Sequence, residues 1–439
     1  MGVCAETYVA DPAATDGPGH YLSLVARLQP GDTLELPAGM YRQRLDLSGL
    51  RGTTDAWITI AGPTSGEPAV VTTDSSCCNV VQLGGTAFVA IKFLTIDGNS
   101  EAMRAAVDGV NAKGGITHDI TIEGCVIRGV SYSQQTVGIA TRSMAWSWIV
   151  RGNTLLEAGT GMYLGDSDGS AQFVAGTIEG NLFVDTIGYN VEVKFQKPYV
   201  APVGMPTSAR TIIRDNVFMK RRPQSSWPRN IVSGARPNLL VGGFPASGAG
   251  ADNLYEIARN FFFANADGES LLQASGRVAI HDNVFVATTT SLRLVDHDLP
   301  LQYADVYNNT FYGGRRGIVF ESPARQSSRV VGNLVFAAAP ISGPISTRSQ
   351  NVTAGVAAAV AVVAAPSTRL GAMDFYPRPG QARGEQLDLT PFESQIDFDK
   401  DFNGRSKGDR RYRGAYAGEG ANPGWKLDAS RKALARILH

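Results

Sequence analysis

Short runs of alternating apolar and polar residues recur along the chain, and most of them end at an asparagine. Between residues 120 and 340 the runs are ITIEGCVI, WIVRGNTL, GTIEGNLF, TIIRDNVF, YEIARNFF, VAIHDNVF, ADVYNNTF and SRVVGNLV. Their alignment places at one position Cys125, Asn153, Asn181, Asn216, Asn260, Asn283, Asn309 and Asn333, with successive spacings of 28, 28, 35, 44, 23, 26 and 24 residues. A period in the twenties with occasional longer insertions is typical of a solenoid.

The alternation predicts short strands on both sides of each asparagine. We expect the asparagine itself to take the left-handed backbone conformation of the turn, which it tolerates better than other non-glycine residues. In coils stacked about 4.8 Å apart, the asparagine amides can form a ladder of hydrogen bonds. The prediction is an all-β fold, a single right-handed parallel β-helix of about ten coils. Helical repeats and a propeller fit this composition and period less well.

The two ends of the repeat differ from its middle. Residues 20–41 read as a short helix, a turn and a first strand, which we expect to cap the solenoid, and residues 88–99 read as a coil in which an apolar residue replaces the asparagine. After about residue 340 the pattern fades, and KLDASRKALARIL at 426–438 predicts a terminal helix. We therefore predict a capped β-helix domain over 1–340 and a C-terminal region over 341–439 that packs on it.

The amino-acid composition limits the classes of partner that the protein is expected to bind. Glycine is frequent, at 49 residues, and charged residues make up only 18% of the chain, as expected for a turn-rich β protein. Lysine plus arginine equals aspartate plus glutamate at 40 each, so no overall field favours nucleic acid or an anionic membrane. The apolar tract at 355–365 is too short to span a bilayer. We expect a monomer that binds neither nucleic acid nor membrane.

The sequence says less about the cellular compartment in which the protein acts. The opening MGVCAETYVADP has no basic segment followed by an apolar one, so no signal peptide is visible. The cysteines are Cys4, Cys77, Cys78 and Cys125, and a disulfide from Cys4 to Cys77 or Cys78 and buried free thiols both fit this pattern.

The chain resembles the pectate-lyase-like superfamily of right-handed parallel β-helix proteins. The resemblance rests on the opening GDTLELPAGMY, the repeated G-N-x-F and D-N-x-F turns, and runs such as GMYLGD and NVEVKF, and it covers roughly residues 20–340. The sequence motifs typical of the polygalacturonase-type hydrolases (NTD, DD, HG and RIK) and of the alginate epimerases (DPH) do not occur as sets in this sequence. The resemblance implies a secreted or periplasmic carbohydrate-facing protein, in a superfamily of lyases, hydrolases, epimerases, esterases and adhesins.

A second strand follows each asparagine turn, and its alternation separates core from surface. We expect eight apolar residues to point into the core, namely Ile139, Met162, Leu164, Val191, Val193, Leu271, Ile318 and Phe320. Their neighbours would line one outer face on which an extended polymer could lie: Arg142, Tyr163, Glu192, Lys194, Arg293 and Glu321. The alternative is that this face is polar for solubility alone.

Three further features accompany this face. Asp166 and Asp168 in GDSDGS can offer oxygen ligands to Ca²⁺, although a solvated turn needs no metal. His297 follows one of the outer strands and is a candidate for proton transfer or for a salt-bridged turn. Long insertions after Asn181 and Asn216 carry cations around an aromatic residue, which suits an anionic sugar or describes only a basic loop: Arg221, Arg222, Trp227, Arg229 and Arg236, with Lys220.

These features give two enzymatic hypotheses and one of binding alone. A polysaccharide lyase would use Lys194 as base, Arg142 and Arg293 as partners of a uronate carboxylate, and Glu192, Asp166 and His297 in support. A glycoside hydrolase would draw two carboxylates from Asp166, Asp168, Glu192, Glu269 and Asp296. A non-catalytic protein would bind glycan without cleaving it, and its binding would survive loss of Lys194 and Glu192. Substrate-binding candidates are Tyr163 on the outer face and Trp227 in the long insertion. The β-elimination hypothesis is preferred.

Overall fold

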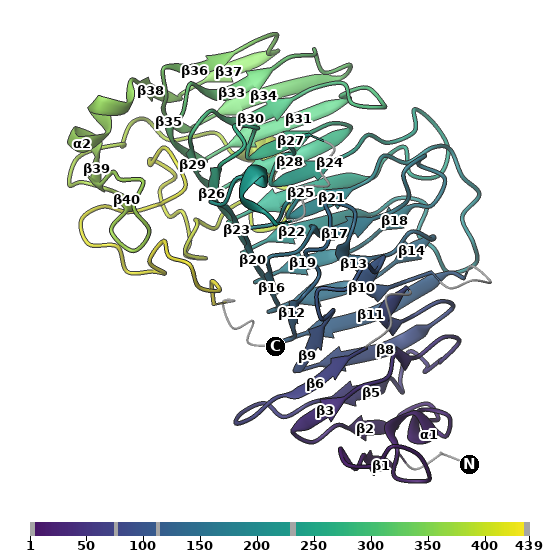
Figure 1. Ribbon diagram of the computed structural model, residues 1–439. Coiled ribbons are helices and arrows are strands. Elements are labelled where there is room, and N and C mark those ends of the chain that lie inside the picture. The colour runs from purple at the N-terminus through teal and green to yellow at the C-terminus, as the bar shows by residue number, and fades with distance from the viewer. Residues whose placement is uncertain (1–4, 74–77, 111–114, 229–233, 434–439) are drawn as a thin grey trace. The chain divides into compact units, whose positions relative to one another are not determined.

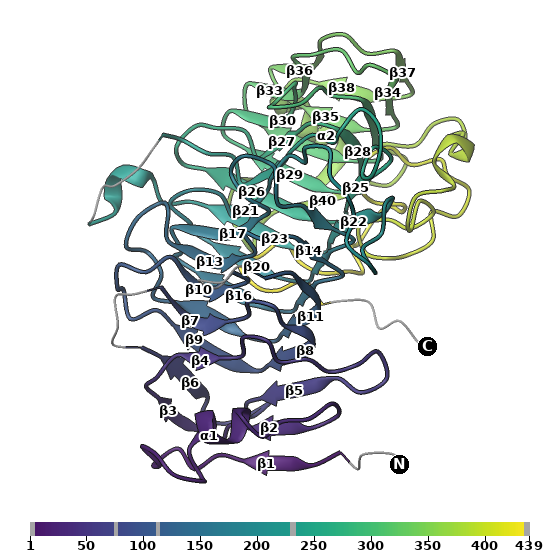
Figure 2. The same cartoon turned by 90° about the vertical axis from the view of Figure 1, so that its right-hand side faces the viewer.

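A computed structural model describes residues 5–73, 78–110, 115–228 and 234–433. The chain divides into two compact units. The first consists of residues 1–206 and 225–234, and the second of residues 207–224 and 235–439. The regular structure of each unit consists mainly of short strands. Figures 1 and 2 show these strands stacked coil upon coil.

The first unit contains three parallel sheets, here called A, B and C in the order in which the chain visits them around a coil. Sheet A contains β1 (Thr7–Val9), β2 (Thr33–Glu35), β5 (Ile58–Ala61), β8 (Ala87–Lys92), β11 (Thr117–Glu123), β15 (Ile149–Arg151) and β19 (Thr177–Glu179), with β14 (Ala145–Trp146) paired to β11 and β18 (Phe173–Val174) paired to β14. Sheet B contains β3 (Gly39–Tyr41), β6 (Ala69–Thr72), β9 (Leu94–Asp97), β12 (Val126–Arg128), β16 (Thr154–Leu156) and β20 (Leu182–Val184). Sheet C contains β4 (Leu45–Asp46), β7 (Asn79–Gln82), β10 (Ala105–Asp108), β13 (Val137–Ala140), β17 (Thr160–Leu164) and β21 (Val191–Val193).

The second unit repeats the three-sheet plan. Its sheet A contains β22 (Arg210–Arg214), β25 (Leu254–Ala258), β28 (Arg277–His281), β31 (Tyr303–Tyr307), β34 (Ser327–Val331) and β37 (Thr347–Ser349). Sheet B contains β23 (Val217–Lys220), β26 (Phe261–Asn265), β29 (Val284–Ala287), β32 (Thr310–Gly313), β35 (Leu334–Phe336) and β38 (Val352–Ala354). Sheet C contains β24 (Leu239–Val241), β27 (Leu272–Ala274), β30 (Thr290–Leu294), β33 (Arg316–Phe320) and β36 (Ala339–Ser342). The coils thus continue through Ala354, beyond the point near residue 340 where the sequence pattern fades.

The alternation of side chains along the strands fills the core as the sequence predicts. All eight residues expected in the core are buried, each at most 2% exposed. In the second unit, Phe218 and Phe262 form one stacked pair of rings, and Phe285 and Phe311 form another. Because each coil places a ring directly over the last, burial and ring stacking both favour the parallel register. The all-β, right-handed parallel β-helix prediction is confirmed.

The asparagine ladder is present, but the left-handed residue is not the asparagine. In the second unit, Asn283 Nδ2 donates to Asn309 Oδ1 at 2.9 Å, and Asn309 Nδ2 donates to Asn333 Oδ1 at 3.0 Å. The positive φ angle belongs to the residue before each asparagine, for example 56° at Asp282. The sequence prediction was wrong by one position, because the preceding residue makes the bend and frees the asparagine amide to bond along the stack.

The N-terminal cap matches the prediction. Helix α1 (Tyr21–Val25) buries Tyr21 and Leu24 beside the first coils (Figure 2), although strand β1 precedes it. In the coil at 88–99, Leu94 occupies the ladder position and is buried. Phe93 takes the left-handed conformation one residue earlier, with a φ of 56°.

The C-terminal region has little regular structure. It contains the short helices η2 (Val356–Ala358), α2 (Ala359–Val362) and η3 (Thr390–Phe392), and the antiparallel pair β39 (Val363–Ala365) and β40 (Asp374–Pro377). A further 3-10 turn, η1 (Gln224–Ser226), lies in the insertion after Asn216. The helix predicted at 426–438 does not form over its described part, residues 426–433. Lys432 is instead drawn into a buried ion pair, as set out below.

Two remaining sequence expectations concern the cysteines and the membrane. Cys78 is disulfide-bonded, whereas Cys125 is a buried free thiol in the ladder position. Cys4 and Cys77 lie outside the described residues. In the described part of the chain, no helix is long and apolar enough to cross a bilayer.

Candidate functional site

The outer face of sheet C in the first unit carries a column of side chains, one from each coil. The strand register aligns Gln82 with Asp108, Asp108 with Ala140, Ala140 with Tyr163, and Tyr163 with Glu192. Their neighbours along the strands, such as Met162 and Val191, are fully buried in the core. Tyr163 and Glu192 thus alternate with core residues as the sequence predicts, but Glu192 is only 4% exposed, and Asp108 and Ala140 are fully buried.

Four of the predicted site residues meet in the last coils of this face. Lys194 Nζ lies 3.0 Å from Glu192 Oε1 and 5.9 Å from the centre of the Tyr163 ring. The guanidinium carbon of Arg142 lies 5.7 Å from the centre of the same ring. Two cations thus lie against one half-buried phenol, with a carboxylate at hydrogen-bond distance from one of them.

Arg142 stands out within this group. Among the described residues, its guanidinium makes no hydrogen bond and no ion pair, although the side chain is half-buried. Burial lowers its pKa, and nearby Asp108 offsets part of that effect. Its φ is 46°, a left-handed conformation that is costly for a side chain with a Cβ. A strained arginine with unused donors is positioned to receive an anion.

The charged neighbours of Arg142 already have partners. Arg104 Nε donates to Asp108 Oδ2 at 2.6 Å, and the Asp108 side chain is fully buried beneath it. Neither residue was predicted from the sequence, because their coil lacks a strand run that ends at an asparagine. In AAVDGV at 105–110, apolar residues alternate as they do in the other strands of sheet C. This alternation predicts that Asp108 points away from the core.

Tyr163 is a neutral phenol in this setting. Burial raises its pKa to about 12, and Glu192 adds to the effect, whereas Arg142 and a hydrogen bond with Ser167 oppose it. The ring can therefore offer an O–H group and an apolar face at any physiological pH. Both suit a sugar, which presents hydroxyl groups at its edge and C–H groups on its face.

The aspartates proposed as metal ligands hold a turn. Asp166 accepts hydrogen bonds from Ser170 Oγ at 2.9 Å and from the Ala171 amide at 3.0 Å, and Asp168 accepts one from the Ser170 amide at 2.9 Å. Asp168 also faces Lys197 at 3.7 Å. The described residues contain no group of three or more His, Cys, Asp or Glu side chains arranged to hold a metal ion.

Arg293 and His297 belong to the second unit. On its sheet C, Arg293 Nη2 lies 2.7 Å from Glu321 Oε2, and Nη1 donates to Gln273 at 3.1 Å. His297 Nε2 lies 3.5 Å from Asp298 Oδ2 in a tight turn closed by backbone bonds with Leu299. This pair is an ion pair only when the imidazole is protonated, so both roles of His297 stay predictions from the sequence.

The basic insertion is less open than its sequence suggests. Lys220 is fully buried and donates to the Arg236 carbonyl at 2.8 Å, and burial lowers its pKa to about 8. Trp227 is only 4% exposed, so its ring does not provide the open stacking surface that was predicted. Arg221 is exposed and Arg222 partly so, while Arg229 lies outside the described residues.

Comparison with known proteins gives matches among solved structures only. No protein-family model and no curated protein matches the chain. The catalytic unit of an α-1,3-glucanase from Streptomyces thermodiastaticus is 13% identical, with 81% of this chain and 69% of that chain covered and a TM-score of 0.52. An A-module of a mannuronan C-5 epimerase from Azotobacter vinelandii is 17% identical (74% and 91% covered, TM-score 0.46), and an alginate lyase from a Paenibacillus species is 14% identical (80% and 96% covered, TM-score 0.44). At such an identity the likeness to the glucanase unit shows a shared fold alone, the parallel β-helix.

Proposed function

We propose that this parallel β-helix binds an extended acidic polysaccharide on the outer face of sheet C of its first unit and cleaves it by β-elimination. The proposal rests on Arg142. Its guanidinium is half-buried and has no polar partner among the described residues, and its backbone is held in the left-handed conformation. Arginine binds a carboxylate through two parallel hydrogen bonds. Stacked coils present groups about every 4.8 Å, which suits a polymer that lies along the stack.

The surrounding residues supply the groups that β-elimination needs. A proton leaves the carbon next to a uronate carboxyl, so the carboxylate must be neutralised and a base must lie nearby. Arg142 would bind the carboxylate, Tyr163 would contact the sugar, and Lys194 would be the base. To act as the base, Lys194 must first release its ammonium proton, either to water or to the Glu192 carboxylate 3.0 Å away.

We expect wild-type protein to release unsaturated uronate products, followed by their ultraviolet absorbance, from at least one of pectate, alginate and the glycosaminoglycans. Lys194→Ala should lower kcat by about 10²- to 10⁴-fold, the usual contribution of a general base. Lys197→Ala is the matched control, since Lys197 is an exposed lysine three residues away. No unsaturated product from wild type on the whole panel rules out the lyase proposal, and reducing ends without it indicate hydrolysis.

Calcium remains a prediction from the sequence. Two carboxylates, one of them facing a lysine, are too few for the six to eight oxygen ligands that Ca²⁺ takes. An ion at Asp166 and Asp168 would have to share its coordination with a substrate carboxylate. If so, a chelator should raise KM for the polymer several-fold and Asp166→Asn should abolish that effect, while an unchanged KM would remove calcium from the mechanism.

The remaining sequence predictions extend this proposal. Arg221, Arg222, Arg236 and Arg293 belong to the second unit and stay predictions from the sequence, as contacts for an acidic polymer. The disulfide at Cys78 supports a secreted or periplasmic location, where such bonds persist. We also propose that the protein acts as a monomer.

A further inference from the structure

In the second unit, the turn between sheets A and B carries an unusual set of residues in the left-handed conformation. One such residue precedes each ladder asparagine, with φ from 50° to 64°: Asp215, Arg259, Asp282, Asn308, Gly332 and Gln350. Three of the corresponding positions in the first unit are glycine, namely Gly124, Gly152 and Gly180. Glycine takes this conformation without strain, whereas residues with a Cβ do not. The charged residues of the second unit therefore need another explanation.

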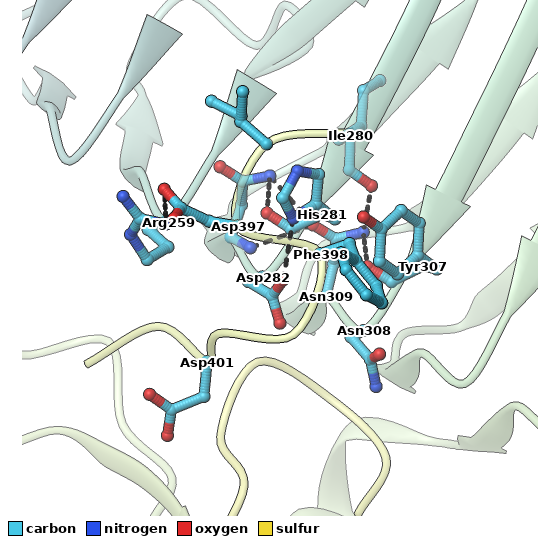
Figure 3. Close-up of polar contacts among 12 residues, drawn as sticks. Arg259, Ile280, His281, Asp282, Tyr307, Asn308, Asn309, Asp397, Phe398 and Asp401 are labelled. Atoms are coloured by element: carbon cyan, nitrogen blue, oxygen red, sulfur yellow. Dashed lines mark hydrogen bonds and ion pairs between the residues drawn. The ribbon is translucent and has the colours of Figure 1, made fainter. Parts of the chain in front are cut away.

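Residues 387–432, here called the C-terminal strap, contact every one of these turn residues. Lys432 Nζ lies 2.8 Å from Asp215, Asp397 lies 2.8 Å from Arg259, and Lys407 Nζ lies 2.9 Å from Asp282. Figure 3 shows Asp397 and Phe398 beside Arg259, Asp282 and Tyr307. The charges alternate along the turn column as minus, plus and minus, and the strap matches each with its opposite.

The other three turn residues meet the strap through polar backbone contacts. Asn308 Nδ2 donates to the Tyr412 carbonyl at 3.3 Å, and the Gly414 amide donates to the Gly332 carbonyl at 2.8 Å. The carbonyl of Gln350 accepts a hydrogen bond from Arg413 Nε at 3.2 Å. The strap thus contacts the column once per coil over six successive coils.

Apolar contacts strengthen the same docking. Leu387, Leu389 and Phe392 of the strap form a buried cluster with Tyr307 and Val331 of sheet A. The Phe392 ring stacks on Tyr307 with 4.0 Å between ring centres, and the opposite face of Tyr307 stacks on His281 at 4.8 Å. Such burial supplies non-directional attraction, while the charge pairs fix the register.

The ion pairs are buried deeply enough to be costly when broken. Lys407 and Lys432 are each 5% exposed, and Asp282 is fully buried. Burial raises the pKa of Asp282 to about 7, although Lys407 opposes the shift, and burial lowers the pKa of Lys432 to about 8. Removal of Lys407 therefore leaves Asp282 without a cation, whereas Asp215 is paired with both Lys432 and Arg259, each at 2.8 Å.

The order of assembly follows from the sequence positions of these partners. Asp215, Arg259 and Asp282 are 44 and 23 residues apart in the chain and form a column only after their coils have stacked. The strap therefore has no complete docking surface until the coils exist. We propose that the C-terminal strap is a lock that closes last on the turn column and opens separately from the coils.

Native-state proteolysis of the full chain tests the lock, with cleavage sites mapped by mass spectrometry. Lys407→Met is expected to speed cleavage within residues 387–432 by about 100-fold or more, since it leaves buried Asp282 without its cation. Lys432→Met should speed it less, since Asp215 keeps its ion pair with Arg259 at 2.8 Å. Cleavage in the coils should speed up much less. Lys400→Met is the matched control, because Lys400 pairs with Asp399 at the surface.

Two further variants keep the test decisive should a lysine variant fail to fold. Asn308→Gly removes the long hydrogen bonds of Asn308 Nδ2 to the Tyr412 and Gly332 carbonyls without straining the left-handed backbone, and should speed strap cleavage by a few-fold. The double variant Asp282→Asn, Lys407→Met removes both buried charges and should be cleaved more slowly than Lys407→Met alone. Equal acceleration in strap and coils, rates like those of Lys400→Met, or a double variant no slower than the single one would each overturn the proposal.

Discussion

Replacing Arg142 with glycine is expected to weaken polysaccharide binding by about 10- to 100-fold, since hydrogen bonds to charged groups contribute roughly 1.5–3 kcal/mol. The same change should leave the folded protein within about 1 kcal/mol of wild type. Glycine relieves the left-handed strain at a φ of 46°, which offsets the lost contact with Tyr163 and the added freedom of the unfolded chain. Calorimetric titration with oligosaccharide and thermal unfolding measure the two effects.

Two variants serve as controls for Arg142. Arg410 also has a left-handed backbone, with a φ of 54°, so Arg410→Gly relieves similar strain in the second unit and should not affect binding. Arg142→Lys keeps the charge but loses the two parallel hydrogen bonds and should bind with intermediate affinity. If Arg142→Gly binds as wild type does, the anion site is elsewhere. A large loss of stability in that variant would show that Arg142 has a structural role.

Replacing Asn283 with alanine is expected to destabilise the second unit by about 3–5 kcal/mol, since several buried polar groups would lose their partners together. Asn283 Nδ2 donates to Asn309 Oδ1, to the Ile257 carbonyl and to the His281 carbonyl, and its Oδ1 accepts from Asn260. No water reaches the site, because the side chain is fully buried. Denaturant unfolding, with hydrogen exchange over residues 254–320, measures the loss.

The end of the ladder provides the matched control. Asn351 bonds to Val330 and Ser349 in the same manner, but it is only partly buried. Water can replace the amide there, so Asn351→Ala should cost about 1 kcal/mol or less. Equal losses at Asn283 and Asn351 would show that the ladder is a consequence of the stack and contributes little to its stability.

The strand alternation and the asparagine period were sufficient to predict the fold from sequence. One asparagine per coil and apolar residues on alternate positions allow few arrangements other than stacked parallel strands. The sequence did not predict which residue of each turn takes the left-handed conformation, since both Asp and Asn in a run such as HDN tolerate it. The structure assigns the bend to Asp282 and the hydrogen bonds to Asn283.

For the candidate site, the same alternation predicted that Tyr163, Glu192 and Lys194 face outward. It did not predict that Arg142 has no polar partner among the described residues, or that Asp108, paired with Arg104, lies in the same column as Tyr163. Those facts depend on register between coils, and irregular loop lengths hide that register in the sequence. Trp227 shows the opposite error, since a loop residue expected at the surface is buried.

The sequence by itself therefore determined the coil, because its period and its alternation are local properties of short segments. Only the tertiary structure decided what lies against the coils. Lys407 and Lys432 look like ordinary surface lysines in a tail, and the second was expected in a terminal helix. Their buried partners, Asp282 and Asp215, are 125 and 217 residues away in the chain. Charge pairs over such separations have no local pattern, since they form only when the whole fold brings the two groups together.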